Sequence, residues 1–298
     1  MDRHGAAKVA AVTGCCGRLG RACANALVED GWTVRGVDRS DRARALHPSI
    51  DFHQGGLDDI AVLEKAFHGA DAVVHLAACP DDADLETVLV PSNVIGVSNV
   101  CDACTRCGVQ TLLLASSGKV HAGHRGALPI KTTDAVSVVC KYGASKLFAE
   151  GAAQAFVHSA APPDPSGGGS QGPPPSSTGP RRLCVVVRFA WAPRTPEDVA
   201  AMRARAEEAG QGADEFLSPS DAGRFAVAAL RNPNGLSGYH LFFCQSVPPP
   251  GRPARFDLRD AADKLGWAPR DTFPADIEAL CASDDYTPDA RLFPRVAS

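Results

Sequence analysis

Short apolar runs alternate with amphipathic segments along the first two thirds of the chain. The apolar runs predict strands at residues 8–13, 33–38, 50–54, 72–77, 111–115 and 183–189. Segments with apolar side chains every three or four positions predict helices at residues 18–30, 60–68, 86–107 and 141–158. This alternation predicts an α/β fold, with a Rossmann-type, doubly wound parallel sheet.

Beyond residue 189 the pattern becomes less regular. It predicts helices at 196–210, 218–230 and 257–265, and a strand at 239–243. The segment APPDPSGGGSQGPPPSSTGP has no hydrophobic anchor, so we expect residues 161–181 to be a disordered surface insertion, with a functional linker as the alternative. We therefore divide the chain into a sheet domain, 1–192 plus 217–246, and a small substrate lobe, 193–216 plus 247–298.

Composition narrows the class of protein. The chain has 298 residues, of which 45% are hydrophobic, and this suits one large α/β domain with a small extra lobe. A formal charge of -4 gives no basic field for nucleic acid or an anionic membrane. No apolar run reaches the length of a bilayer span, and residues 1–8 are too short and polar for a signal peptide. We therefore expect a soluble, cytoplasmic protein.

The chain contains 11 cysteines. An odd number without a signal peptide argues against a disulfide framework, so we expect reduced thiols. Cys101, Cys104 and Cys107 form C-x-x-C-x-x-C, a spacing that iron–sulfur ligands also use. Because Cys101 and Cys104 share an apolar helical stripe with Val94 and Val97, we interpret them as small core residues and expect no metal site.

A glycine-rich segment, VTGCCGRLG, connects the first predicted strand to the first predicted helix. Glycines suit a tight turn and a close approach of backbone to a pyrophosphate, which the free N–H groups of the helix N-terminus then bind. The strand–turn–helix context therefore predicts a dinucleotide loop rather than an ordinary β–α turn. Its candidate cofactor contacts are Gly14, Gly17, Arg18, Leu19 and Gly20.

Asp38 ends the second predicted strand. A carboxylate at this point accepts hydrogen bonds from the adenosine ribose hydroxyls and repels a 2′-phosphate, which favours NAD over NADP. Arg18 and Arg39 lie close by in the sequence and offer the alternative of holding a 2′-phosphate.

Tyr142 and Lys146 form Y-x-x-x-K at the start of a predicted helix. The four-residue step places both side chains on one helix face, where an ammonium lowers the pKa of a phenol. The phenolate can then take a hydroxyl proton while a hydride leaves the same carbon. Ser117, at the end of the fifth predicted strand, is placed to hold the substrate oxygen.

Several segments together resemble a known family. They are VTGCCGRLG, DAVVHLAA, NVIGVSNVCDAC, LLLASSGKVHAG, YGASKLFAE, VVRFAWAP and LGWAPRDTF. In order and spacing they are similar to the extended short-chain dehydrogenase/reductases, the NAD-dependent epimerase/dehydratase group, over residues 8–273 apart from the insertion. The short lobe and the segments ASSGKVHAG and SPSDAGRFAVAAL look most like hexuronate (uronate) dehydrogenases.

The resemblance implies roles for individual residues. Ser117, Tyr142 and Lys146 match the family's catalytic serine, tyrosine and lysine, and Asn93 matches an asparagine that bends its helix and supports a proton relay to the lysine. The positions that match the family's cofactor contacts are Leu57, Leu76, Ala77, Ala78 and Pro193, in addition to Tyr142 and Lys146. The family also implies a homodimer, through the helices that begin near residues 86 and 141.

The chain departs from the uronate dehydrogenase pattern at substrate positions. Those enzymes carry Asn-His after the catalytic serine, where Gly118 and Lys119 stand here, and a serine after the sixth strand, where Trp191 stands. Lys119 and Arg194 are the cations available for a substrate carboxylate. Gly56 also replaces the acidic residue that usually precedes the leucine of the third-strand motif.

These observations favour an NAD-dependent oxidoreductase that oxidises a hydroxyl of a sugar or sugar acid. The alternatives are a redox-neutral nucleotide-sugar epimerase or dehydratase, and a non-catalytic NAD(P)-binding regulator. Regulators of this kind often lack the tyrosine or the lysine, and both are present here.

Overall fold

The structure is a computed structural model of the 298-residue chain. It describes residues 7–41, 46–159, 182–193, 197–198, 200–202, 204, 215–248 and 250–272. The expected insertion at 161–181, Arg194 and most of the expected helix at 196–210 lie outside the described residues.

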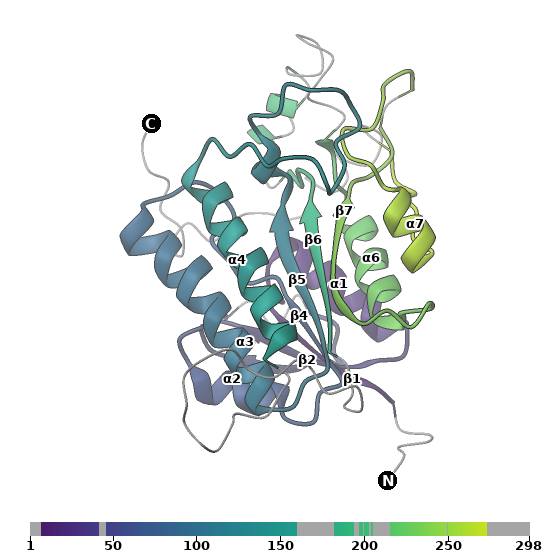
Figure 1. Cartoon of the computed structure of the whole chain (residues 1–298). Coiled ribbons are helices and arrows are strands. Elements are labelled where there is room, and N and C mark those ends of the chain that lie inside the picture. Colours follow the sequence, from purple (N-terminus) through teal and green to yellow (C-terminus); the bar gives the residue numbers. More distant parts are fainter. Residues whose placement is uncertain are drawn as a thin grey trace.

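A seven-stranded parallel sheet forms the centre of the molecule (Figure 1). The strands are β1 (Val9–Thr13), β2 (Thr33–Asp38), β3 (Asp51–Gln54), β4 (Ala72–His75), β5 (Thr111–Ser117), β6 (Leu183–Phe189) and β7 (Gly238–Cys244). Their order is β3-β2-β1-β4-β5-β6-β7. Successive strands are added toward one edge of the sheet from β1 to β3 and toward the other edge from β4 onward, so the order reverses between β1 and β4. Doubly wound sheets bind ligands at such a point, at the carboxyl ends of the strands. The predicted fold class is confirmed.

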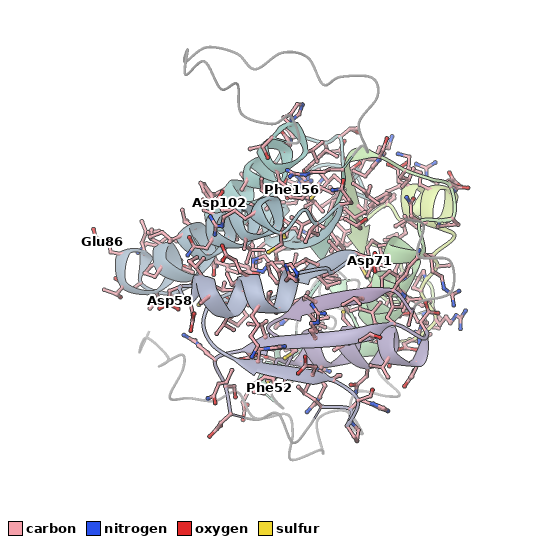
Figure 2. The ribbon with its side chains drawn as sticks, turned by 90° about the horizontal axis from the view of Figure 1, so that it is seen from below. Phe52, Asp58, Asp71, Glu86, Asp102 and Phe156 are labelled. Carbon is pink, nitrogen blue, oxygen red and sulfur yellow. The ribbon has the colours of Figure 1, made fainter. Side chains whose placement is uncertain are left out.

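Helices cover both faces of the sheet (Figure 1). One face carries α1 (Arg18–Glu29), α6 (Pro219–Arg231) and α7 (Arg259–Leu265), and the other carries α2 (Ile60–Phe67), η2 (Leu85–Ile95), α3 (Gly96–Arg106) and α4 (Lys141–His158). Figure 2 shows the second group of helices from below, with Asp58, Glu86 and Asp102 on their outer side. Phe156 of α4 belongs to the buried core on this face. The nearly continuous apolar strands reflect burial on both faces.

One predicted helix takes a different form. The segment expected as a single α-helix over 86–107 is a π-helix, η2, followed by α3. Pro91 lies inside η2 and has no N–H to donate, so an unbroken α-helical ladder is impossible at this position. Several other predicted elements differ from the structure by one or two residues at their ends, as in β5, which extends two residues further to Ser117, whereas β2, β6 and α4 have the predicted bounds.

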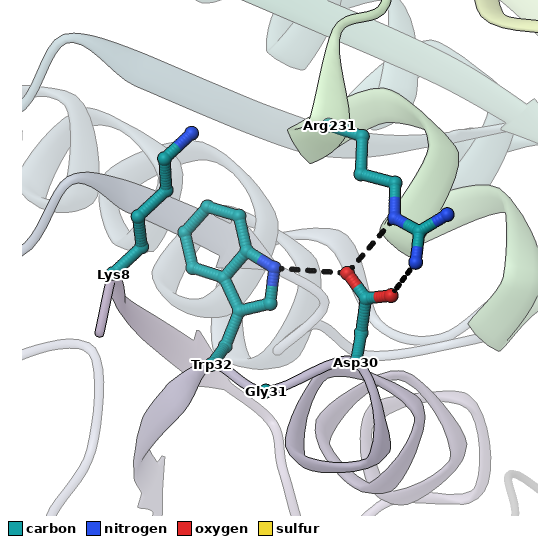
Figure 3. Close-up of a pocket in the computed structure, with 5 residues that line it drawn as sticks. All are labelled: Lys8, Asp30, Gly31, Trp32 and Arg231. Carbon is teal, nitrogen blue, oxygen red and sulfur yellow. Dashed lines mark hydrogen bonds and ion pairs between the residues drawn. The ribbon is translucent and has the colours of Figure 1, made fainter. Parts of the chain in front are cut away.

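The amino-terminal edge of the sheet is closed by local contacts. The Asp71 side chain accepts a hydrogen bond from the Val9 backbone at 2.8 Å, and Figure 2 shows Asp71 on this side. Nearby, a surface pocket of about 240 Å³ lies beside Trp32, with Lys8 over the indole and Asp30 paired to Arg231 (Figure 3). Since Lys8 and Trp32 precede β1 and β2, this pocket lies at the edge opposite the carboxyl ends of the strands.

Among the described residues, no helix combines the length and the apolarity that crossing a membrane requires.

Candidate active site

The glycine-rich loop between β1 and α1 is packed too tightly for side chains. Gly14 has φ +73°, and a Cβ added to it would lie 2.6 Å from the Ala77 nitrogen. A Cβ on Gly20 would lie 1.9 Å from the Gly14 carbonyl oxygen. The loop therefore needs glycine at both positions, and this brings the start of α1 close to the ends of β1 and β4.

The start of α1 is open toward this loop. Its N-cap, Gly17, has no side chain to accept the first backbone N–H groups of the helix. Those N–H groups, with the positive end of the helix dipole, are suited to a phosphate. The predicted loop residues Arg18 and Leu19 follow immediately, and both are half-buried. The cradle fits the pyrophosphate of a dinucleotide.

Asp38 lies at the carboxyl end of β2, directly beside the glycine-rich loop. One carboxylate oxygen accepts a hydrogen bond from the Cys16 backbone at 3.0 Å, and the other accepts one from the Ser40 backbone at 2.9 Å. Each oxygen retains a further lone pair, and the side chain is half-buried. The carboxylate is thus fixed in a position where ribose hydroxyls can donate to it.

The other predicted cofactor positions are distributed around this loop. Leu76 and Ala77 lie against Gly14, and Ala78 follows them in the same segment. The Leu57 side chain lies against α3, where a Cβ on Gly96 would be 2.6 Å from its Cδ1. Pro193 is buried just beyond β6. The structure therefore brings Leu76 and Ala77 to the loop, whereas Leu57 packs mainly on a helix.

Tyr142 and Lys146 occupy one face of α4, as the spacing predicts. The Lys146 Nζ lies 5.6 Å from the centre of the Tyr142 ring and donates to the Ala115 carbonyl of β5 at 3.1 Å. Lys146 is 4% exposed, and this burial lowers its pKa from 10.5 to about 8. The ammonium is thus held between the tyrosine and the strand that ends in Ser117.

Ser117 ends β5 and begins a short 3₁₀ turn, η3 (Gly118–His121). Its Oγ accepts a hydrogen bond from the Lys119 backbone at 3.2 Å. Because the oxygen acts as the acceptor in that bond, the hydroxyl hydrogen is left to donate to another oxygen. Lys119 itself is exposed.

Asn93 connects two parts of the site. Its Oδ1 accepts from the Cys79 backbone N–H at 2.8 Å, and its Nδ2 donates to the Cys79 carbonyl at 3.1 Å and to Ser145 Oγ at 3.0 Å. Ser145 in turn donates to the Tyr142 carbonyl at 2.7 Å. The Asn93 side chain therefore holds the loop after β4 against the first turn of α4.

His75 is a satisfied core histidine. Its Nδ1 lies 2.8 Å from Thr13 Oγ1, and burial together with the Lys146 charge lowers its pKa to about 3. The ring is therefore neutral near pH 7.

A buried polar network beside the site escaped the sequence analysis. Glu150 and Arg188 form two hydrogen bonds of 2.8 Å, Ser116 donates to Glu150 at 2.6 Å, and Arg188 donates to His121 Nε2 at 2.8 Å. Glu150 lies one helical turn after Lys146, on the same face of α4. An arginine within the apolar strand LCVVVRF was the one signal available, because a buried arginine requires an anionic partner.

This network fixes four neighbouring elements relative to one another. It joins α4, β5, β6 and η3 through side chains that are all less than 10% exposed. The structure buries the His121 ring completely, with its centre 5.7 Å from the centre of the Phe243 ring and tilted by 52° to it, so His121 supports η3 from within.

A doubly wound sheet with a glycine-lined loop, a carboxylate after β2 and a Tyr–Lys pair is the arrangement of a dinucleotide-binding protein. The family model described as "NAD dependent epimerase/dehydratase family" matches residues 10–161. The chain therefore belongs to the NAD-dependent epimerase/dehydratase family, and as a member it is an enzyme with NAD as cofactor.

Individual relatives match only parts of the chain. It is 33% identical over 114 residues to the Bos taurus protein "Sterol-4-alpha-carboxylate 3-dehydrogenase, decarboxylating", covering 38% of this chain and 32% of that protein. It is 30% identical over 166 residues to the Oryza sativa subsp. japonica UDP-glucose 4-epimerase 3, covering 50% of this chain and 44% of that protein. The chain thus spans less than half the length of either relative.

The similarity in fold covers a larger part of the chain than the similarity in sequence. A solved structure described as "Mutated Uronate Dehydrogenase" superposes with a TM-score of 0.69 and 21% identity, over 91% of this chain and 85% of that one. At this level of identity the likeness shows the fold.

Proposed function

We propose that the protein is an NAD-dependent dehydrogenase that oxidises a hydroxyl group of a sugar or sugar acid, with Ser117, Tyr142 and Lys146 as its catalytic residues. The observation that carries the proposal is the position of Lys146, 5.6 Å from the Tyr142 ring and bonded to β5 two residues before Ser117. One buried ammonium thereby links the proposed base to the strand that carries the proposed substrate-binding serine.

Each residue has a distinct part. The Ser117 hydroxyl donates to the substrate oxygen, because its own oxygen already accepts from the Lys119 backbone. The Lys146 ammonium stabilises the Tyr142 phenolate, and burial strengthens that interaction by excluding water. The phenolate then accepts the hydroxyl proton of the substrate. When bound, NAD supplies the acceptor for the hydride that leaves the same carbon.

The cofactor contacts follow from the same geometry. Gly14, Gly17 and Gly20 admit the pyrophosphate to the start of α1, and Asp38 accepts from the ribose hydroxyls. The fixed negative charge of Asp38 opposes a 2′-phosphate, which favours NAD over NADP.

A sugar acid is the substrate class that the surroundings of Ser117 favour. Lys119 is exposed two residues after the serine and provides a cation for a carboxylate, and Arg194 is the second candidate from the sequence. The similarity in fold to a uronate dehydrogenase agrees with this class of substrate.

A redox-neutral epimerase is the second candidate function. Its support is the 30% identity with UDP-glucose 4-epimerase 3, which covers half of this chain. The same tyrosine and lysine serve both reactions, and the two differ in whether NADH accumulates.

We also propose that the protein forms a homodimer through η2 and α4. Ile95 and Phe148 on these helices are 51% and 43% exposed, so each helix presents a large apolar side chain that a second copy of the chain could bury. Sedimentation of Ile95→Lys and Phe148→Glu variants tests this proposal, since a monomer is expected from each and an unchanged dimer would contradict it.

The decisive experiment follows NADH absorbance with purified protein, NAD and a panel of substrates. The panel contains aldohexuronates, aldoses, UDP-sugars and a 3β-hydroxysteroid. We expect NADH to accumulate with a free sugar or sugar acid. Interconversion of UDP-sugars without NADH would replace the dehydrogenase with the epimerase, and NADH from the steroid alone would overturn the sugar assignment.

A further inference from the structure

We propose that Cys15, Cys16 and Asp38 form a binding site for a soft divalent cation of the Zn²⁺ class, and that this cation excludes NAD from the protein. The inference depends on the NAD site of the family and is independent of the reaction and substrate proposed above. In the part of the chain that the structure describes, this is the one set of three His, Cys, Asp or Glu side chains with convergent ligand atoms.

The two sulfur atoms and a carboxylate oxygen all lie within 4.8 Å of one another. Bound zinc holds sulfur at about 2.3 Å and carboxylate oxygen at about 2.0–2.2 Å. Tetrahedral angles at those lengths separate the ligand atoms by about 3.5–3.8 Å. Small side-chain rotations therefore complete a three-ligand site, with water as the fourth ligand.

The backbone already holds the three residues in this arrangement. The Gly14 and Cys15 N–H groups donate to the Val37 carbonyl at 2.8 and 3.5 Å, and the Cys16 N–H donates to Asp38. These bonds join the glycine-rich loop to the end of β2. The convergence thus needs no rearrangement of either element, which reduces the entropic cost of binding.

Gly36 makes room for the buried sulfur. A Cβ on Gly36 would lie 2.7 Å from the Cys15 Sγ, so the thiol occupies space that the side chain of any other amino acid at position 36 would fill. Cys15 is fully buried, whereas Cys16 is half-buried. The more accessible Cys16 thiol and the Asp38 carboxylate provide the path of entry for a cation.

The donor set selects the class of cation. Two sulfurs and one carboxylate suit zinc or cadmium, whereas magnesium and calcium require oxygen ligands. Both thiols release their protons to solvent when the cation binds.

Competition with NAD follows from Asp38. The same carboxylate is proposed to accept from the ribose of NAD, and the cation would draw on its remaining lone pairs. A cation between the loop and β2 would also lie beside the start of α1, where the pyrophosphate is expected. Cation and cofactor therefore cannot occupy the protein together.

The test uses reduced full-length protein freed of metal, in a thiol-free buffer. Calorimetry measures NAD binding with and without Zn²⁺, and the ultraviolet thiolate-to-metal band is recorded on adding Cd²⁺. We expect Zn²⁺ at ten times its own Kd to raise the apparent Kd for NAD about tenfold. An NAD affinity unchanged by Zn²⁺ would overturn the proposal.

Variants assign the effect to this site. Cys16→Ser, at a half-buried side chain, should lose the competition and weaken the Cd²⁺ band while keeping the Kd for NAD within threefold. Cys15→Ala provides a second variant, and Cys107→Ser, another half-buried thiol but outside the site, should behave as the wild type. Competition that survives in Cys16→Ser, or that disappears in Cys107→Ser, would contradict the assignment.

Discussion

The Lys146 ammonium lies 5.6 Å from the centre of the Tyr142 ring. Both side chains are more than nine-tenths buried, so water screens their interaction only weakly. The lysine is also bonded to the Ala115 carbonyl, which fixes its distance from the tyrosine. In the proposed reaction, this pair is therefore preorganised to stabilise a phenolate before any substrate arrives.

The buried lysine should reduce the stability of the protein below pH 8. Its pKa is about 8 when folded and near 10.5 when unfolded, so the folded state disfavours the ammonium. The penalty is complete below pH 8 and disappears as the pH rises from 8 to 10.5, because the unfolded chain then binds more protons. Lys146→Met should raise the free energy of unfolding by about 1–3 kcal/mol at pH 7 and lose this advantage by pH 10.5.

Urea unfolding of wild type and Lys146→Met at the two pH values measures this difference without cofactor. The comparison cancels the other titrating groups, which both proteins share. A gain in stability that is the same at pH 7 and pH 10.5 would show that ionisation of Lys146 is not its cause.

Adding one methyl group should have opposite effects at two glycines, Gly20 near the glycine-rich loop and Gly151 in α4. Gly20→Ala would place a carbon 1.9 Å from the Gly14 oxygen, so the loop must shift and the Kd for NAD should rise more than tenfold. Gly151→Ala, in α4, meets no atom within 4 Å and should stabilise the protein by about 0.5–1 kcal/mol. Calorimetry with NAD and thermal unfolding test the pair, and equal NAD affinity in both variants would count against the loop.

Asp38 should determine the choice of cofactor. Asp38→Asn removes the charge that repels a 2′-phosphate and weakens the bonds to the ribose. The Kd for NAD should rise about tenfold, whereas the Kd for NADP should fall or stay constant. Asp41→Asn, three residues later and exposed, is the control and should change neither Kd. If the ratio of the NAD and NADP affinities is unchanged in Asp38→Asn, residues other than Asp38 determine the preference for NAD.

The buried ion pair between Glu150 and Arg188 should be far more important for stability than an exposed pair. Glu150→Gln leaves the Arg188 charge buried without its partner and should cost about 3–5 kcal/mol. Glu64→Gln breaks the pair with Arg106, whose side chains are 42% and 49% exposed, and should cost less than about 1 kcal/mol. Urea unfolding measures both losses of unfolding free energy. Similar losses in the two variants would contradict the claim that burial makes the Glu150–Arg188 pair more important than the exposed pair.

The sequence was sufficient for the sheet and for the residues that lie in local motifs. Continuous apolar strands, amphipathic helices and the Y-x-x-x-K step depend on neighbours within a few residues, and the described part of the chain contains them, with the π-helix η2 as an exception. Gly14, Gly20 and Asp38 could be proposed as cofactor contacts because a tight turn and a strand end have local signatures.

Features that depend on distant residues were not accessible in this way. Glu150 on α4 and His121 on η3 are structural residues because both bond to Arg188, which the fold brings to them from β6. The π-helix η2 contains Pro91, and its Asn93 bonds to the segment after β4, a contact that local periodicity does not encode. The periodicity of that segment fitted an α-helix, so the pattern alone gave no warning.

The account is tested most directly by Tyr142→Phe, which removes one hydroxyl group and retains the ring that packs on Cys79 and Leu89. Rates of NADH formation with the best sugar substrate, and the Kd for NAD, are measured for wild type and variant. We predict a loss in kcat of about 10²–10⁴ with a Kd for NAD within threefold of wild type. A variant that forms NADH at more than a tenth of the wild-type rate would contradict the assignment of Tyr142 as the base.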